Sequence, residues 1–415
     1  MRCDVLVVEE GRTLMKNIWN KNYILLLQGQ LVSTLGDALY TIALSLFMLE
    51  LTGSATLVGT IMGLVTIPRI ILGPFAGTII DRYNKKLFII LPDLVRGITI
   101  SLVALLAYQN RLSAWILIIV AIIDGICIAF FNPTIETTIP LLVEDECLVQ
   151  ANSIFNMLVT GFNILGQTLG GALYNLLGAP LIFLINGISY IFSAGTETFI
   201  SLPAKKEKEH EHSFFHDMKQ GITYIFADKG LFILIAMSFF LNFLFGIIRV
   251  LIIPWFVNTN GFGEAKYGFF NGACSVGMIV GMLILSLFKI KDKFKYYVYT
   301  FSVFLFIILV DVAAIMNKFG LVMVCFLFAF AFQIVFNTLM NTTIVLNTEE
   351  SLRGKIASTR ITLCMAASPI GNFIGGILGD RLPANYAIMI CSTVALIISV
   401  FFLQKKEIKK YFGLS

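Results

Sequence analysis

Six ionisable side chains that could carry chemistry fall inside long apolar stretches of the sequence: Asp37, Arg69, Asp93, Arg96, Asp124 and Arg249. A charge in the hydrocarbon of a membrane costs roughly 2.5–3.5 kcal/mol on insertion scales, so such residues are kept for function. Asp37 and Asp124 lie near the middle of their stretches. We predict that they are proton-coupling groups, since a carboxyl group removed from water can hold a proton and release it when water arrives.

The other charges allow several interpretations. Asp37 could instead be a permanently ionised structural partner of Arg69, which lies at a similar depth. Asp93 and Arg96 are three residues apart, on one face of a helix, which indicates a structural or gating pair. Arg249 is a candidate contact for substrate or for the coupling ion.

Uncharged polar residues recur at helical spacing in several of the same stretches. Together with Arg69 and Arg249 they are our candidates for lining a substrate cavity: Gln30, Asn156, Asn163, Asn242, Gln333, Asn337 and Asn341. Many of the 37 phenylalanines lie in the stretches that follow residue 230. Those on polar faces would form an apolar cavity wall, which suits a bulky amphipathic substrate.

Composition identifies the elements that must position these residues. Of 415 residues, 58% are hydrophobic and 13% are charged, which excludes a soluble enzyme, a secreted disulfide protein and a disordered chain. The net charge is +5, but the basic residues are not concentrated in one domain, so nucleic acid is excluded as a partner.

Apolar runs of about 20 residues cross a bilayer as helices. We predict twelve such spans, near residues 23–49, 56–80, 87–108, 113–138, 152–176, 180–200, 230–256, 266–288, 296–316, 320–346, 356–379 and 386–404.

Lys and Arg residues predict how the chain is oriented, because basic loops resist translocation. With both termini in the cytoplasm, 23 of the 30 basic residues lie in inside loops and tails, 4 lie outside and 3 lie within spans. We therefore expect a multi-pass protein of a plasma membrane, namely a bacterial inner membrane, with both termini cytoplasmic.

From the end of the fourth span through the fifth, the sequence repeats itself after a shift of 205 residues. Asn132 falls on Asn337, Gly166 on Gly371, and Gly170-Gly171 on Gly375-Gly376. A slightly larger shift places Gly59 and Gly63 on Gly268 and Gly272. This duplication predicts two pseudo-symmetric six-helix bundles, at 23–200 and 230–404, preceded by a lead-in (1–22), joined by a cytoplasmic linker (201–229) and followed by a tail (405–415). Internal repeats of this kind are typical of secondary transporters. The repeated glycines predict close helix packing.

The linker holds all three histidines, His210, His212 and His216, and residues 213–227 suit a short interfacial helix. A metal-binding tract is the alternative for the histidines, but we expect a solvated connector, no metal site and no cofactor. No span contains a histidine, and no nucleotide-binding loop is present, so we expect no enzymatic activity.

The loop after the second span reads Gly-Pro-Phe-Ala-Gly-Thr-Ile-Ile-Asp-Arg-Tyr-Asn-Lys-Lys from residue 73. It resembles the G-x-x-x-D-[RK]-x-G-[RK]-[RK] motif of the major facilitator superfamily, with Asn84 at the place of a glycine whose backbone is left-handed. Phe131-Asn132-Pro133-Thr134 and Ala151-Asn152-Ser153 are similar to the drug-exporter branch that includes macrolide efflux pumps and the enterobactin exporter.

The resemblance implies an all-α membrane protein of the major facilitator fold. It also implies that Gly77, Asp81 and Arg82 belong to a cytoplasmic gate, in which we include Asp93 and Arg96, and that Asp81 accepts hydrogen bonds from the start of span 11. Gly166, Gly170, Gly171, Gly371, Gly375 and Gly376 resemble, in part, a packing element of proton-coupled exporters.

We therefore expect a monomeric secondary transporter that exports amphipathic small molecules, such as drugs, macrolides or siderophores, by alternating access. A proton or Na⁺ gradient would drive it, and the lipid bilayer would be its surroundings. One alternative is a transporter of lipids or lysophospholipids. Another, from a different class, is a membrane sensor or receptor that transports nothing.

Overall fold

The computed structural model describes residues 18–202, 214–288, 290–349 and 352–413, and in these residues every regular element is a helix. Eleven helices in these ranges are long and apolar enough to cross a membrane. They are α1 (Lys21–Thr52), α2 (Ala55–Arg82), α3 (Lys85–Tyr108), α4 (Ala114–Leu142), α5 (Leu148–Glu197), α7 (Lys229–Asn258), α8 (Glu264–Leu287), α9 (Asp292–Ile315), α10 (Phe319–Leu346), α11 (Arg353–Arg381) and α12 (Ala384–Leu403). The expected all-α membrane fold is confirmed.

Helix α5 contains two of the predicted spans. It runs through 50 residues, but at Gly178 the backbone turns to φ 73° and ψ 165°, which is not helical. Glycine adopts such a positive φ without steric cost, and Pro180 follows two residues later, where it suits the start of a new helix. The chain therefore reverses at Gly178, and the two arms of α5 are the fifth and sixth spans.

The shorter elements are α6 (Phe214–Ala227), α13 (Lys406–Tyr411) and a 3₁₀ turn η1 (Asp145–Cys147). Helix α6 confirms the short helix predicted in the linker. Helix α13 was not predicted. The remaining part of the linker, with His210 and His212, and most of the N-terminal lead-in lie outside the described residues.

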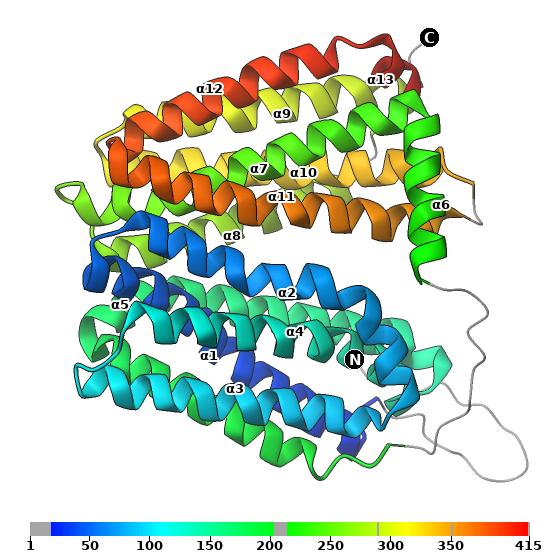
Figure 1. The fold of residues 1–415 in the computed structure, drawn as a ribbon. Coiled ribbons are helices and arrows are strands. Elements are labelled where there is room, and N and C mark those ends of the chain that lie inside the picture. The colour runs from blue at the N-terminus through cyan, green and yellow to red at the C-terminus, as the bar shows by residue number, and fades with distance from the viewer. Residues whose placement is uncertain (1–17, 203–213, 289, 350–351, 414–415) are drawn as a thin grey trace, which may run out of the picture. The chain divides into compact units, whose positions relative to one another are not determined.

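The chain forms two compact units, and residues 45–70 group with the second half of the sequence. The first unit holds residues 1–44 and 71–209; there α3 packs against α4 and α5 (Figure 1). An apolar cluster joins α1, α4 and the start of α5 around Tyr23 and Leu26. The Tyr23 hydroxyl donates to the carbonyl of Ala151 at 2.8 Å, which satisfies the one polar atom of that buried side chain.

The second unit holds residues 45–70 and 210–415. In it α7 packs against α11 and α12, while α10 packs against α8 and α9 (Figure 1). A cluster of aromatic rings fills one end, where Phe256 lies 4.9 Å from Phe270 and 5.1 Å from Phe262, measured between ring centroids. How the two bundles predicted at 23–200 and 230–404 divide the molecule stays a prediction.

Candidate functional site

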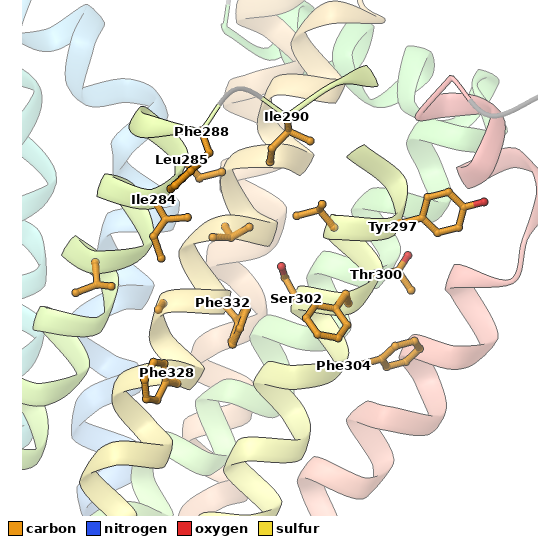
Figure 2. A pocket seen from close by; sticks show the side chains of 15 residues that line it. Ile284, Leu285, Phe288, Ile290, Tyr297, Thr300, Ser302, Phe304, Phe328 and Phe332 are labelled. Carbon is orange, nitrogen blue, oxygen red and sulfur yellow. The ribbon is translucent and has the colours of Figure 1, made fainter. Parts of the chain in front are cut away.

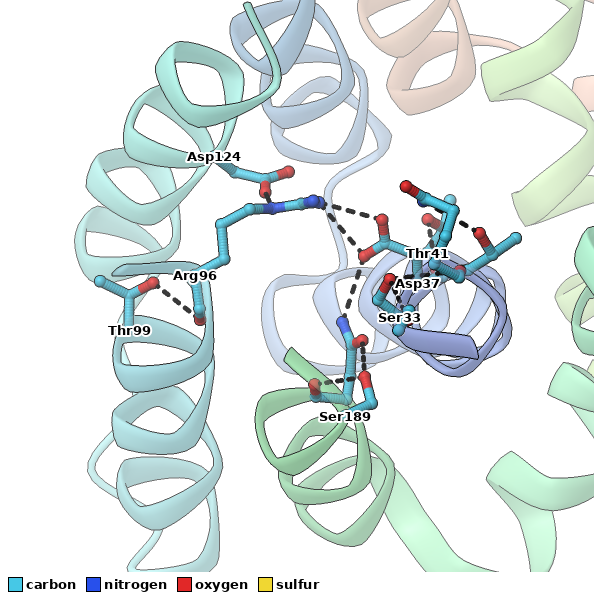
Figure 3. Close-up of polar contacts among 11 residues, drawn as sticks. Ser33, Asp37, Thr41, Arg96, Thr99, Asp124 and Ser189 are labelled. Carbon is cyan, nitrogen blue, oxygen red and sulfur yellow. Dashed lines mark hydrogen bonds and ion pairs between the residues drawn. The ribbon is translucent and has the colours of Figure 1, made fainter. Parts of the chain in front are cut away.

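The first unit contains an ionic network centred on Arg96 of α3 (Figure 3). The Arg96 Nε donates to Asp124 Oδ1 of α4 at 2.5 Å. Its Nη2 donates to both oxygens of Asp37 of α1, at 3.2 and 3.0 Å. One guanidinium thus binds carboxylates from two other helices, as its fork of N–H donors allows.

Residues of the second arm of α5 complete the network. The Tyr190 ring lies under the guanidinium, with its centroid 4.1 Å from the Arg96 Cζ. Asn186 donates through Nδ2 to Asp37 Oδ1 at 3.3 Å, and Ser189 donates to Asn186 Oδ1 at 3.2 Å. Neither Asn186 nor Tyr190 was predicted from the sequence as a site residue. The feature that could have identified both is a polar group inside the sixth span.

The three charged groups differ in their access to solvent. The side chain of Arg96 is 5% exposed, that of Asp124 14%, and that of Asp37 35%. Asp37 is therefore the acid of this network that water or a ligand reaches most easily. A proton on Asp37 would remove its charge and weaken its bonds to Arg96, so the arrangement can convert protonation into a change of ion pairing.

Asp93 and Arg96 do not form the ion pair that their spacing indicates. The two Arg96 nitrogens named above donate to Asp124 and Asp37, and neither oxygen of Asp93 accepts a hydrogen bond of standard geometry from the described residues. The i,i+3 rule describes neighbours on an isolated helix, whereas here α1 and α4 offer acceptors better aligned with the guanidinium. Asp37 meets Arg96 in the first unit. Its predicted pairing with Arg69, a residue of the second unit, stays a prediction.

The predicted cavity residues have different surroundings. Asn163 accepts from Gln167 Nε2 at 2.6 Å, and Asn242 donates to the carbonyl of Ser238 at 2.8 Å. The half-buried members are Gln30, Arg69, Asn163, Asn242, Gln333 and Asn337, whereas Asn156, Arg249 and Asn341 are exposed. Whether these residues line one substrate cavity stays a prediction.

The repeated glycines lie where helices approach closely. A Cβ added at Gly166 would lie 2.5 Å from the Ala38 Cβ of α1. In the second unit, a Cβ at Gly371 would lie 2.1 Å from the carbonyl oxygen of Phe243 of α7. Similar approaches under 3.0 Å are present at Gly170, Gly375 and Gly376, and Gly171 is buried. These distances support the packing role that we propose for the glycines.

The predicted cytoplasmic gate is described only in part. The side chains of Asp81 and Arg82 lie outside the described part of the chain, and an added Cβ at Gly77 would meet no described neighbour within 4 Å. The expectation of a left-handed backbone at Asn84 is wrong. Asn84 has φ −71° and ψ 110°, and its side chain accepts from the Lys86 N–H, so it caps the start of α3. An extended N-cap with a side-chain acceptor is a common way to begin a helix.

Asp380 forms a contact that the sequence did not reveal. It lies in the last turn of α11 and accepts from the backbone N–H of Ala55 at 2.6 Å, from that of Thr56 at 3.2 Å and from the Ser54 hydroxyl at 2.8 Å. All four residues belong to the second unit. A carboxylate at the C-terminal end of its own helix is electrostatically unfavourable, so its role as a cap for α2 explains its position.

An apolar pocket of about 690 Å³ lies between α8, α9 and α10 of the second unit (Figure 2). Phe288, Phe301, Phe304, Phe328 and Phe332 are among its 15 lining residues, none of which is charged. A pocket of this size and lining can hold the apolar part of an amphipathic molecule.

Membrane-length helices around an ionic network are compatible with a membrane transporter. The family model described as Major Facilitator Superfamily matches residues 26–370, and the chain belongs to this family. It is therefore a multi-pass membrane transporter of that superfamily and not an enzyme.

Relatives cover nearly the whole chain. Macrolide efflux protein A of Streptococcus pyogenes is 23% identical over 410 residues, which is 95% of this chain and 98% of that protein. The staphyloferrin A transporter of Staphylococcus aureus (strain NCTC 8325 / PS 47) is 22% identical, over 90% and 94% of the two chains. Among solved structures, the nucleoside transporter NupG has a TM-score of 0.71 at 14% identity and covers 91% of this chain and 98% of its own. A bacterial homologue of the iron transporter ferroportin, in its inward-facing state, has a TM-score of 0.71 at 16% identity and covers 93% and 99%.

Proposed function

We propose that this chain is a proton-coupled exporter of amphipathic small molecules that works by alternating access in the plasma membrane. The observation that carries the proposal is the network of Asp37, Arg96 and Asp124, because a carboxylate bound to a buried guanidinium is an ion pair that a proton can open. The similarity to macrolide efflux protein A supports export and an amphipathic substrate.

The coupling step follows from the charges. The Asp37 carboxyl is held by Arg96 and Asn186. A proton that binds Asp37 neutralises it, and the guanidinium loses one of the two carboxylates that accept its hydrogen bonds. Binding energy that differs between two conformations is what shifts their populations, so protonation of Asp37 would favour the conformation in which Arg96 has other partners.

Transport in proteoliposomes tests the proposal. Purified protein is reconstituted, a pH gradient or a Na⁺ gradient is imposed, and uptake is measured for a macrolide, a siderophore and a lysophospholipid. We expect the pH gradient to drive transport of the macrolide or the siderophore. Asp37→Asn should abolish the dependence on the gradient while substrate binding persists, because an amide cannot take up the proton.

Asp292→Asn is the matched control, since Asp292 is an exposed acid at the start of α9. Unchanged gradient dependence in Asp37→Asn would rule out coupling at this residue. Transport driven by the Na⁺ gradient and not by the pH gradient would identify Na⁺ as the coupling ion.

Transport of a lysophospholipid is the second candidate. The uncharged aromatic pocket between α8, α9 and α10 favours it, because an acyl chain needs such a lining. Transport of the lysophospholipid and of neither drug-like compound would establish this candidate in place of drug export.

A further inference from the structure

Two acidic side chains that the ionic network does not use are buried together in the first unit. Asp93 of α3 is 0% exposed, and Glu197, the last residue of α5, is 1% exposed. They lie in the interface between α3 and the second arm of α5, where Asp93 contributes to the electrostatic field at Glu197. An ionised carboxylate in such a place needs hydrogen-bond donors or a cation.

Neither acid has enough hydrogen-bond donors or cations around it to be ionised at low cost. Within the described ranges, both oxygens of Asp93 and the Oε2 of Glu197 accept no hydrogen bond of standard geometry, and the Ser193 hydroxyl lies close to Asp93 as well as to Glu197. The Ser193 hydroxyl lies 3.3 Å from Glu197 Oε1 and donates to it. Arg96, one turn from Asp93, donates to Asp124 and Asp37 instead.

Close packing encloses the pair. A Cβ added at Gly29 of α1 would lie 2.8 Å from the Ser193 hydroxyl, and one added at Gly97 would lie 3.1 Å from the carbonyl oxygen of Gly187. Next to Glu197, the Lys86 ammonium donates to the carbonyl of Thr198 at 2.6 Å. The pair therefore lies between the Arg96 network and the end of the unit that the basic loops predict to be cytoplasmic.

We propose that Asp93 and Glu197 form a proton-holding site that exchanges protons with the cytoplasm and alternates with Asp37 as the partner of Arg96. This deepens the proposed function and rests on it for the coupling role. Two carboxyl groups that share a buried site keep at least one proton between them, because both cannot ionise together. The charged and titratable groups that face Asp93 are Arg96 of the same helix, Asp37 of α1, Cys127 of α4 and Tyr190 of α5, and Lys86 at the start of α3 lies next to Glu197.

The exchange balances in protons and charge. One proton binds the Asp37 carboxylate, and its bonds to the Arg96 Nη2 break. The guanidinium turns to Asp93, one helical turn away, and the Asp93 carboxyl releases its own proton through Glu197 to the cytoplasm. One proton enters and one leaves, and Arg96 keeps an anionic partner throughout.

Infrared difference spectroscopy between two pH values, on the whole protein in lipid, tests the proton-holding site. We expect wild type to show a protonated-carboxyl C=O band at neutral pH that shifts in D₂O. The band should be lost in the double variant Asp93→Asn, Glu197→Gln and kept in Glu407→Gln, an exposed acid elsewhere. Ser193→Ala, which keeps both acids, should shift the band. An unchanged band in the double variant would overturn the site.

The coupling role is tested separately. If the wild type is driven by a pH gradient, the double variant should lose that drive by roughly a hundredfold, as expected when a positioned proton-transfer group is removed. Full drive in the double variant would overturn the exchange while leaving proton coupling intact. A wild type that ignores the gradient would refute the proposed function and the exchange, and the infrared band would still decide whether the pair holds a proton.

Discussion

Arg96 determines the chemistry of the first unit because one side chain joins its own helix to three other segments. Its Nε and Nη2 point to acids on α4 and α1, and its planar face lies on the Tyr190 ring of α5. A lysine ammonium would supply the charge but neither the fork of donors nor the flat surface. The geometry therefore depends on arginine and not only on a positive charge.

Arg96→Met should destabilise the protein by about 3 kcal/mol, the lower end of the cost of breaking a buried ion pair, since Asp37 is 35% exposed and can regain water. Arg96→Lys should destabilise it less and still impair transport. Thermal unfolding in detergent and flux in proteoliposomes measure the two effects. Arg111→Met, at an exposed loop position, is the control. Equal stability of Arg96→Met and the control would contradict the network's structural role.

The acids and the arginine of this network could be predicted from the sequence, but their pairing could not. Asp37, Asp124 and Arg96 are conspicuous because charges are rare in apolar spans. Which acid binds Arg96 depends on how α1, α3 and α4 pack. The sequence of α3 alone indicates a neighbour on the same helix face, which here is Asp93. Asn186 was missed for the same reason, since its contact with Asp37 joins residues far apart in the sequence.

At the scale of elements, hydropathy predicted the helices well and their ends less well. The sequence shift of 205 residues also relates helix boundaries: α4 begins at residue 114 and α10 at 319, while α5 begins at 148 and α11 at 353. The short helix α13 escaped prediction because its six residues are mostly charged and carry no membrane signal. Its buried Ile408 shows that packing against the protein stabilises it.

The cap that Asp380 gives to α2 leads to a prediction at this scale. Asp380→Ala removes the acceptor for the Ala55 and Thr56 N–H groups, at a cost of about 1 kcal/mol, which corresponds to roughly fivefold faster hydrogen exchange in that turn. Hydrogen exchange at the start of α2 measures it. Ser54→Ala should have a smaller effect, because it leaves both backbone bonds in place. No acceleration in Asp380→Ala would show that the turn is held by packing alone.

The whole molecule is a duplication whose two halves have different chemistry. The shift of 205 residues relates α4 and α5 to α10 and α11, and it places Asp124 on Ala329 and Glu197 on Phe402. The helices α7 and α9, which follow α1 and α3 by 208 and 207 residues at their starts, carry Phe245 at the place of Asp37, and Thr300 and Val303 at the places of Asp93 and Arg96. The first half thus keeps the acids proposed to bind protons, and the second half has aromatic residues and a large apolar pocket instead. This division favours a transporter in which the ion and the substrate act mainly on different halves.

The side of the membrane to which each site opens depends on which face of the molecule is cytoplasmic, and the distribution of basic residues predicts that face. In a variant with its seven cysteines replaced, single cysteines at exposed positions report sidedness: Gln109→Cys and Asn317→Cys on the predicted outer face, Glu407→Cys on the inner face. An impermeant maleimide should label the first two in intact cells and the third only after permeabilisation, because Lys- and Arg-rich loops stay in the cytoplasm. Labelling of Glu407→Cys from outside would invert the topology. The Asp93–Glu197 site would then open to the exterior, and the proposed release of its proton to the cytoplasm would be refuted.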